Sequence, residues 1–307
     1  MRLRVSLLLL VAIAVLSFAG PPLVMAIGSD PNEVDLLARY AGPSLTHPLG
    51  TDELGRDELL RLLAGGRVSL AIGIAAAVTA AALGTLIGLV AGYLGGWTDR
   101  VLMRATDAVI ALPLLPLLIV LAALDLGKLG VPAWLAQSDD ISLVRIIALA
   151  VLVGWTTAAR LVRGATLVTR NRDFVRAARS LGAGVPHILL VHILPNVLAP
   201  LIVATTLSVG DVILLESVLS FLGLGIQPPL ASWGTMLSNA QEMITSAPLL
   251  AIYPGMMIFL TVIACNLLGD ALQQRLDRAR RYGPDLQRAG FRRGVPGGWR
   301  RSARSRR

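Results

Sequence analysis

The sequence contains little charge, few aromatic side chains, a single cysteine and a single lysine. Of its 307 residues, 15% are charged and 5% are aromatic. About 25% of residues are charged in a typical soluble domain, so the chain lies far outside that class. Cys265 stands inside an apolar run, where a small buried apolar role is expected, and no disulfide can form within the chain.

Lys128 is the only lysine, and its surroundings exclude nucleotide binding through a P-loop. A P-loop has the pattern G-x-x-x-x-G-K-[ST], in which the lysine contacts the nucleotide phosphates. In this chain Leu129 follows the lysine, and no glycine stands five residues before Gly127. The chain therefore cannot be an ATPase of that type.

Residue patterns that would indicate catalysis or metal binding are also missing. There is no HExxH, no CxxC and no cluster of carboxylates with histidines. His187 and His192 are five residues apart, about 140° around a regular helix, so one such helix cannot direct both at a metal ion. We expect no catalytic residue, no metal site and no cofactor in this chain.

Long apolar sequence is what the chain has in abundance. Hydrophobic residues make up 55% of it, and the mean hydropathy is +0.70. Runs of roughly 20 residues match the bilayer core, in which a helix satisfies its own backbone hydrogen bonds. The sequence thus predicts an all-α, polytopic bundle in the cell membrane with six spans, at 5–27, 68–94, 106–124, 142–162, 197–222 and 248–269. One alternative stays open for the first run, a signal peptide cleaved after Ala26.

Basic residues are distributed unevenly between the loops. With an internal N-terminus, 22 of the 28 fall on the inner side, whereas the outer segment 223–250 has none. The positive-inside rule therefore predicts that both termini are cytoplasmic. Twelve arginines follow Asp270, mostly in a Gly/Pro/Arg-rich tail that we expect to be disordered and to attract anionic lipid headgroups rather than nucleic acid. The predicted organisation is a first span with an external loop (1–67), a transmembrane core with a cytoplasmic loop near 163–196 (68–280), and a basic cytoplasmic tail (281–307).

The cytoplasmic loop carries the pattern of two short helices. Asn171 or Asp173 can cap the first helix, and Gly182 tolerates the left-handed conformation that ends it. Pro186 suits the first turn of the second helix, and Pro195 marks the entry to the fifth span. Such a helix pair is too short to be stable alone, so it needs a surface to pack against.

One face of the first short helix is apolar. Four apolar residues at helical spacing form a stripe with small side chains at its centre: Phe174, Ala177, Ala178 and Leu181. Three arginines fall on the other side of the helix: Arg172, Arg176 and Arg179. Small alanines permit the close approach of another surface. The loop either packs under its own bundle or docks on a cytoplasmic partner.

Two acidic residues lie within the fifth span, Asp211 and Glu216. Ionisable side chains are costly in lipid, so each is expected to face the bundle interior or a water-filled cavity. Their spacing of five residues puts them on different faces. Each either lines a pathway or accepts hydrogen bonds from a neighbouring helix, and the second role is favoured for Glu216, which borders the outer end of the span.

Two further patterns flank and occupy the second span. Residues 52–67 read as an amphipathic helix on the outer surface, whose charged face either receives a partner or is simply solvated. Gly84, Gly88 and Gly92 form a small-residue stripe that lets helices approach closely, within the chain or with a partner.

Several strings together resemble the permease subunits of ABC importers. The string "RAARSLG…HILPN" resembles their EAA loop: Ala177, Ala178, Gly182, Leu194 and Pro195 match at the family spacing, whereas Arg176 replaces the usual glutamate. The strings "HPLGTDELGRD" and "ESVLSFLGLGIQPPLASWG" are similar to the dipeptide/oligopeptide (and nickel) transport subfamily, in particular to the second of its two paired permeases. The resemblance runs from the first span to about residue 280.

This resemblance implies a type I ABC importer permease fold and a set of partners. A second homologous permease chain would complete the pathway, two ATPase chains would bind ATP and Mg²⁺, and an extracytoplasmic binding protein would deliver a peptide or similar small solute. Residues 176–182 would then be the helix that couples to an ATPase, although Arg176 leaves the usual carboxylate contact in question. A membrane-embedded enzyme and a structural or regulatory subunit without a pathway are the competing classes.

Overall fold

The computed structural model describes residues 2–26, 30–124, 126–129, 132, 139–245 and 247–293. Most of these residues are helical, and within them there is no β-strand. The long helices are α1 (Arg2–Ala26), α2 (Glu58–Leu94), α3 (Gly96–Ala111), α6 (Asp139–Thr169), α9 (Leu194–Phe221) and α11 (Leu249–Arg293). The shorter ones are η1 (Leu36–Ala38), α4 (Leu114–Ala122), η2 (Leu126–Leu129), α7 (Asp173–Ser180), α8 (Val185–His187), η3 (Ile188–Ile193), α10 (Trp233–Asn239) and η4 (Gln241–Met243).

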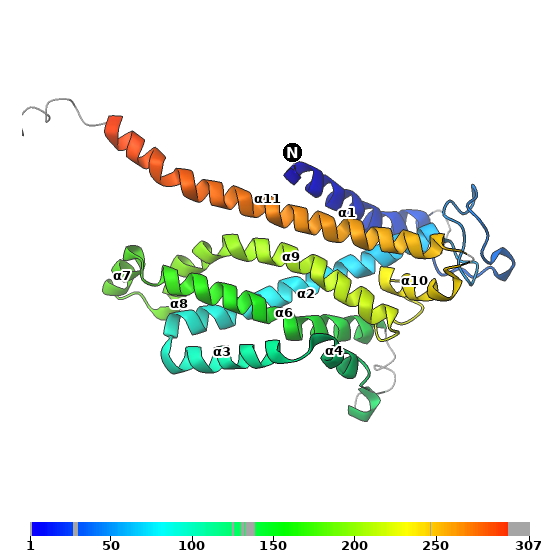
Figure 1. Cartoon of the computed structure of the whole chain (residues 1–307), viewed down its shortest axis with the longest axis horizontal. Coiled ribbons are helices and arrows are strands. Elements are labelled where there is room, and N and C mark those ends of the chain that lie inside the picture. Colours follow the sequence, from blue (N-terminus) through cyan, green and yellow to red (C-terminus); the bar gives the residue numbers. More distant parts are fainter. Residues whose placement is uncertain are drawn as a thin grey trace, which may run out of the picture.

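The helices supply the six spans that the sequence predicts. Five are long and apolar enough to cross a membrane: α1, α2, α6, α11 and the continuous helix formed by α8, η3 and α9. Helices α3 and α4 pass the same test only as a pair, bent by 84° at the break between them, and count as the sixth span when the pair is taken as one. The prediction of an all-helical membrane bundle is confirmed. The long helices run along the length of the molecule, with α7 at one end and α10 at the other (Figure 1); these are called the α7 end and the α10 end.

The second span begins ten residues earlier than predicted, at Glu58. Asp57 caps it, because its carboxylate accepts a hydrogen bond from the backbone N–H of Leu60 at 2.9 Å. The separate amphipathic surface helix predicted over 52–67 is therefore wrong: its second half is the start of α2, and Arg61 is buried there. No proline separates these turns from the apolar run, so the capped helix continues into the span.

The third span is broken, although the sequence predicts one continuous helix over 106–124. Helix α3 ends at Ala111, and α4 starts at Leu114. Pro113 between them has no N–H, and Leu112 before it takes the extended conformation that a following proline favours, with φ of −73° and ψ of 138°. The proline therefore divides this span near its middle.

The second short helix of the loop does not end before the fifth span, as the prediction assumed. Pro186 lies in the first turn of α8, but the chain continues through the π-helical segment η3 into α9. Pro195 lies in the first turn of α9. Pro195 has no backbone N–H, and it stands just after the point where the hydrogen-bond pattern changes from π-helical in η3 to α-helical in α9.

The π-helical segment also brings two histidines together. The ring centroids of His187 and His192 are 5.5 Å apart, since residues five apart share a face of a π-helix. The expected separation of about 140° is therefore wrong, because it assumed a regular α-helix. In the part of the chain that the structure describes, no group of three or more His, Cys, Asp or Glu side chains is placed to hold a metal ion.

The glycine stripe of α2 is used for packing within the chain. Gly84, Gly88 and Gly92 all lie against α6. A Cβ atom at Gly88 would stand 2.6 Å from the carbonyl oxygen of Ala159, closer than real Cβ contacts come. Helices α2 and α6 therefore approach each other backbone to backbone, as small residues permit in membranes.

Helix α1 packs against α2 and α11. Ile13 is buried in a core cluster together with Leu62 of α2 and Trp233 of α10, and Ser17 is buried beside Gly66. These contacts make α1 part of the bundle, which favours the predicted span over a cleaved signal peptide.

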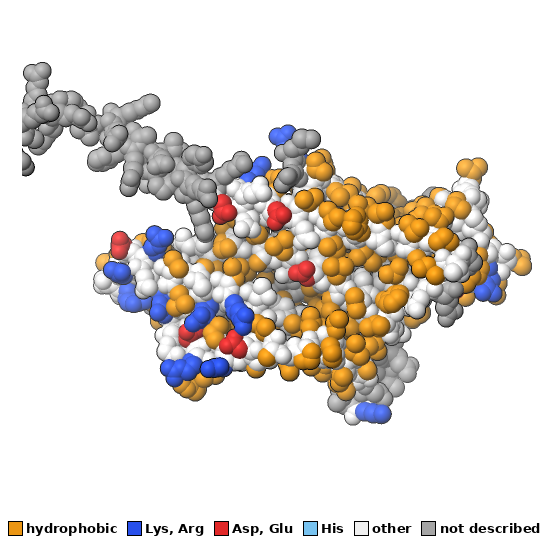
Figure 2. Space-filling view, viewed as in Figure 1, with side chains coloured by type: hydrophobic (Ala, Val, Ile, Leu, Met, Phe, Trp, Pro, Cys, Tyr) orange, Lys and Arg blue, Asp and Glu red, His pale blue; other side chains and the backbone are white. Residues whose placement is uncertain are grey.

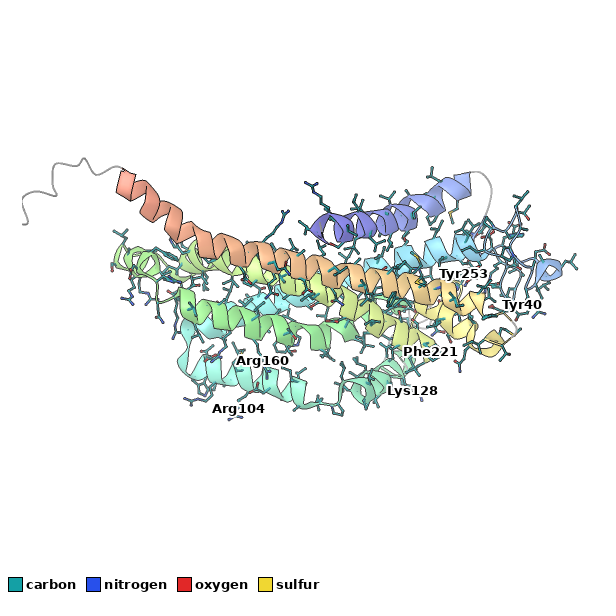
Figure 3. All side chains as sticks on the ribbon, turned by 45° about the horizontal axis from the view of Figure 1, so that its top comes forward. Tyr40, Arg104, Lys128, Arg160, Phe221 and Tyr253 are labelled. Atoms are coloured by element: carbon teal, nitrogen blue, oxygen red, sulfur yellow. The ribbon has the colours of Figure 1, made fainter. Side chains whose placement is uncertain are left out.

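Charged side chains gather at the α7 end, whereas the middle of the same face is largely hydrophobic (Figure 2). Arg104 and Arg160 lie toward the α7 end, and Tyr40 and Lys128 lie toward the opposite end (Figure 3). Helix α11 extends beyond the bundle, so the tail predicted from residue 281 starts as helix, and residues 294–307 lie outside the described part of the chain.

Candidate functional site

Helix α7 ends in a well-defined cap at Gly182, which has a φ of 83°. The backbone N–H of Gly182 donates to the carbonyl of Arg179 at 3.0 Å, and that of Ala183 donates to the carbonyl of Ala178 at 3.1 Å. These two bonds form a Schellman motif, whose left-handed residue is best supplied by glycine. The cap that the sequence predicts is present.

The start of α7 differs from the prediction that Asn171 or Asp173 caps it. Arg172 occupies the N-cap position, and no side chain accepts a hydrogen bond from the first turn. Asn171 instead donates to the carbonyl of Leu167 at 3.3 Å. Asp173 is the first helical residue, where its negative charge interacts favourably with the positive end of the helix dipole.

Helix α7 contacts the bundle through Val175, which is fully buried in a core cluster with residues of α6, η3 and α9. The apolar stripe lies elsewhere on the helix. Phe174 is 45% exposed, Leu181 is 87% exposed, Ala177 is exposed and Ala178 is half-buried. The chain therefore leaves this stripe uncovered, which argues against a loop that only packs under its own bundle.

The other predicted loop residues lie in two places. Arg176 is exposed on α7, and no salt bridge or side-chain hydrogen bond to it is found among the described residues. Leu194 and Pro195 lie at the start of α9, the first half-buried against the core cluster and the second exposed. The structure thus groups Arg176 with the two alanines and Gly182, and separates them from Leu194 and Pro195.

Tyr93, near the end of α2, contacts Arg179 of the loop helix α7. The Cζ atom of Arg179 lies 5.4 Å from the centre of the Tyr93 ring, and its Nη2 donates to the Tyr93 hydroxyl at 3.3 Å. Arg170, just beyond the end of α6, donates from Nη1 to the carbonyl of Gly92 at 2.7 Å. Arg170, from the turn after α6, and Arg179 of α7 therefore both contact the last turn of α2.

Two ion pairs join α3 to α6 at the α7 end. Arg163 forms a two-fold contact with Asp99, Nε to Oδ1 at 2.5 Å and Nη2 to Oδ2 at 2.7 Å. Arg160 Nη2 lies 2.6 Å from Asp107 Oδ1, and both of these side chains are half-exposed. An exposed pair such as Arg160–Asp107 contributes about 0–1 kcal/mol, so it adds little to the stability of the bundle.

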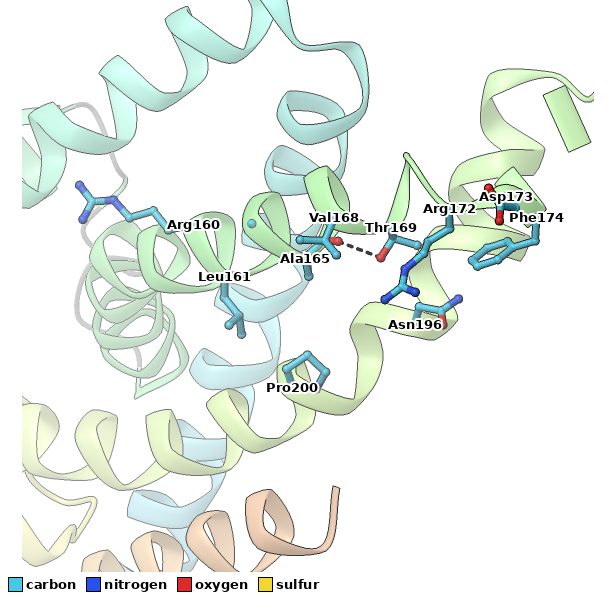
Figure 4. A pocket seen from close by; sticks show the side chains of 11 residues that line it. Arg160, Leu161, Ala165, Val168, Thr169, Arg172, Asp173, Phe174, Asn196 and Pro200 are labelled. Carbon is cyan, nitrogen blue, oxygen red and sulfur yellow. Dashed lines mark hydrogen bonds between the residues drawn. The ribbon is translucent and has the colours of Figure 1, made fainter. Parts of the chain in front are cut away.

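A groove of about 1080 Å³ opens at the α7 end between α6, α7 and α9. Arg172, Phe174 and Asn196 line it on one side, and Arg160 lies on the far side (Figure 4). The groove separates the first turn of α7 from the long helices. Helix α7 is thus held by the bundle on one side only.

Glu216 is completely buried between α9, α2 and α10. Ser69 Oγ donates to its Oε2 at 3.1 Å, and Ser220 Oγ donates to its Oε1 at 2.7 Å. The backbone N–H of Trp233 in turn donates to Ser69 Oγ at 3.2 Å. This network places Glu216 as a hydrogen-bond partner of neighbouring helices.

Asp211 has a different environment on the same helix. It is exposed, and it lines a groove of about 640 Å³ between the α3–α4 break, α6 and α9. Thr157 and Ser208 line the groove with it. Glu216 therefore has a hydrogen-bond donor for each of its carboxylate oxygens, whereas Asp211 faces an open groove.

The strings "HPLGTDELGRD" and "ESVLSFLGLGIQPPLASWG" meet at the α10 end, where Leu49 of the first packs against the core cluster that contains Trp233 of the second. In the first, Asp52 is buried and its Oδ2 lies 2.7 Å from Arg56 Nε and 3.3 Å from Arg61 Nε. In the second, Trp233 is buried and donates from Nε1 to the carbonyl of Leu62 at 3.0 Å. Asp52, Arg56 and Arg61 are thus buried at the α10 end of α2, so they do not form an exposed charged face for a partner.

Three of these features were not singled out by sequence reasoning. Val175 sits beside the apolar stripe but outside its helical spacing, and its burial depends on η3 and α9. Tyr93 carries no local signal, because its partners come from other helices. Pro113 does carry a signal, the loss of a backbone donor inside an apolar run, and it marks the broken span.

Comparison with known proteins agrees with these features. Residues 84–282 match the family described as the binding-protein-dependent transport system inner membrane component. The chain is 38% identical over 276 residues to a Brucella suis biovar 1 protein provisionally named a peptide permease, covering 89% of this chain and 87% of that protein. It is 44% identical over 237 residues to the glutathione transport system permease protein GsiD of Escherichia coli O157:H7, covering 77% of this chain and 73% of GsiD.

A helical membrane bundle that matches this family over most of its length is a membrane transport component. The chain belongs to the family of inner membrane components of binding-protein-dependent transport systems. It is an ABC importer permease subunit rather than an enzyme, it works with a binding protein and an ATPase, and ATP is hydrolysed by that separate subunit. The predicted resemblance, fold and transport role are confirmed, and the competing classes of enzyme and pathway-free subunit are set aside.

Proposed function

We propose that the chain forms half of the translocation pathway of a peptide importer and that α7 docks on an ATPase chain. The observation that carries the proposal is the uncovered apolar stripe of α7, with Leu181 at 87% exposure. An exposed apolar stripe on a short helix is typical of a surface that a partner covers. The alanines at its centre allow that partner to approach closely.

The contacts of α7 suit a coupling element. Val175 anchors it in the core, and Arg179 joins it to Tyr93 of α2. A partner that moves α7 would therefore move the ends of α2 and α6 with it. ATP-driven closure of the ATPase pair would bias the bundle between two states, as coupling requires differential contacts in each state.

The remaining assembly follows the same proposal. A second, related permease chain completes the pathway, two ATPase chains cover the α7 ends, and the binding protein delivers solute at the α10 end. Both termini lie in the cytoplasm, as the arginine distribution favours. The names of the two relatives, a peptide permease and a glutathione permease, support a peptide or peptide-like solute.

A matched pair of substitutions tests the docking surface. Leu181→Ser on α7 should reduce the ATPase recovered when the permease pair is purified, while the second permease stays bound. Leu45→Ser is the control, because Leu45 is 103% exposed at the α10 end. Equal ATPase recovery from both variants would defeat the proposal.

A further inference from the structure

Asp211 is an ionisable group in the middle of the fifth span. It lies ten residues before the end of α9, about 15 Å along the helix axis, which is close to the middle of a hydrocarbon core of about 30 Å. It is exposed, and within the described residues no hydrogen bond or salt bridge satisfies its carboxylate. Glu216 on the same helix shows the contrast, since it is buried and accepts bonds from two hydroxyl groups.

The groove in front of Asp211 is lined mostly by apolar side chains, with three hydroxyl groups and the one carboxylate among them. A carboxylate at this depth faces water or protein, because exposure to hydrocarbon costs several kcal/mol. The α3–α4 break lines the same groove through Ile110, Leu112 and Leu114. Broken backbone at membrane depth is tolerated only where it lines a water-filled cavity or is buried in protein. The carboxylate and the broken backbone thus each indicate that this face contacts water or another protein chain.

Asp211 gives the groove its negative charge. The end of α3 and the start of α4 both contribute to the lining, and they carry partial charges of opposite sign, about half a unit each. These partial charges offset each other, whereas the carboxylate carries a full unit. The side chains of the lining include no basic group, and Thr157 and Ser208 add only neutral hydroxyl groups. The groove therefore favours a cation.

We propose that Asp211 binds the protonated amine of the transported solute as it passes this groove. The inference rests on the proposed function, because it assumes that this face belongs to the solute pathway. An α-amino group has a pKa of about 7.7–8.0 and is largely protonated at neutral pH, so a free peptide N-terminus supplies the matching charge. The class of solute is then a peptide or similar molecule with an unblocked amine.

Thiol labelling tests the charge preference without knowledge of the solute. Ser208→Cys, in a Cys265→Ala background, is made in the complete transport complex and treated with a cationic and an anionic methanethiosulfonate reagent. With Asp211 present the cationic reagent should react faster, and Asp211→Asn should lower the ratio of the two rates about tenfold. Glu216→Gln is the matched control, one acid neutralised on the same helix, and should leave the ratio unchanged.

Three outcomes would overturn the proposal. The first is a rate ratio that Asp211→Asn does not change, and the second is a thiol in the Ser208→Cys variant that neither reagent reaches. The third is loss of the second permease from the Asp211→Asn complex on purification, since this would assign the carboxylate to an ion pair between the two chains.

Uptake into proteoliposomes tests the role in transport. Dialanine uptake by the Asp211→Asn complex should fall about tenfold, the effect of losing one hydrogen bond to a charged group, while Glu216→Gln retains uptake in proportion to its folded protein. Undiminished dialanine uptake by Asp211→Asn would overturn the proposal. A wild-type complex that takes up no dialanine would instead count against peptide import, and the labelling ratio would still decide whether the groove selects a cation.

Discussion

The guanidinium group of Arg179 lies over the ring of Tyr93, with 5.4 Å between Cζ and the ring centre. This contact joins the loop helix α7 to the end of the second span, two elements that are 86 residues apart in the chain. Because α7 is otherwise held mainly by Val175, the contact helps to fix its orientation.

Loss of the Tyr93 ring should weaken the link between ATP hydrolysis and uptake. A cation–π contact at an exposed site contributes about 0.5–1 kcal/mol, so Tyr93→Leu should raise the ATP hydrolysed per solute about two- to fivefold. Tyr93→Phe keeps the ring and should have a smaller effect. Tyr40→Leu is the control, because Arg39 lies 5.7 Å over the Tyr40 ring at the opposite end. An unchanged ATP-to-solute ratio in Tyr93→Leu would show that the contact does not transmit coupling.

Substitution of Gly182 should uncouple hydrolysis from uptake while the protein still inserts. Gly182 has open space around it but a φ of 83°, so Gly182→Val is opposed by backbone strain of about 1–2 kcal/mol and should unwind the cap of α7. Gly184→Ala is the matched control two residues later, where φ is −68° and an added Cβ meets only Pro186 Cδ at 3.9 Å. The prediction is checked by measuring ATPase activity and uptake together, and normal coupling in Gly182→Val would contradict it.

The two intramembrane acids should differ in their effect on stability. Glu216→Ala leaves the hydroxyl groups of Ser69 and Ser220 without their acceptor, which should lower the free energy of unfolding by about 1–3 kcal/mol. Asp211→Ala removes a side chain with no hydrogen bond among the described residues and should change the stability little. Thermal unfolding in detergent measures both. Equal destabilisation would mean that the Glu216 network does not stabilise the bundle.

Cysteine accessibility should give opposite results at the two ends of the molecule. Ser44 lies at the α10 end and Ser180 at the α7 end, and both are exposed. In cells that express the permease pair alone and carry Cys265→Ala, Ser44→Cys should react with an impermeant thiol reagent from outside. Ser180→Cys should react only after the membrane is permeabilised. The reverse pattern would invert the orientation that the arginine distribution predicts.

Apolar content and residue spacing determine the membrane class, the six spans and the capped loop helix. These features depend on length and local chemistry: an apolar run of roughly 20 residues spans the bilayer, and Gly182 tolerates a left-handed conformation wherever it stands. For the same reason the lack of a P-loop pattern excludes an ATPase of that type, because the phosphate-binding residues of a P-loop are neighbours in the chain.

Tertiary structure alone decided which partners the charged residues have and which face of the loop helix is covered. Ser69 and Glu216 are 147 residues apart, and only the packing of α2 against α9 brings the hydroxyl to the carboxylate. The same packing leaves Asp211 open, a residue whose role the sequence left undecided. It also buried Val175 rather than the apolar stripe. Burial is a property of contacts between distant residues, so spacing along the chain predicts which side chains share a helix face, but not which face the fold covers.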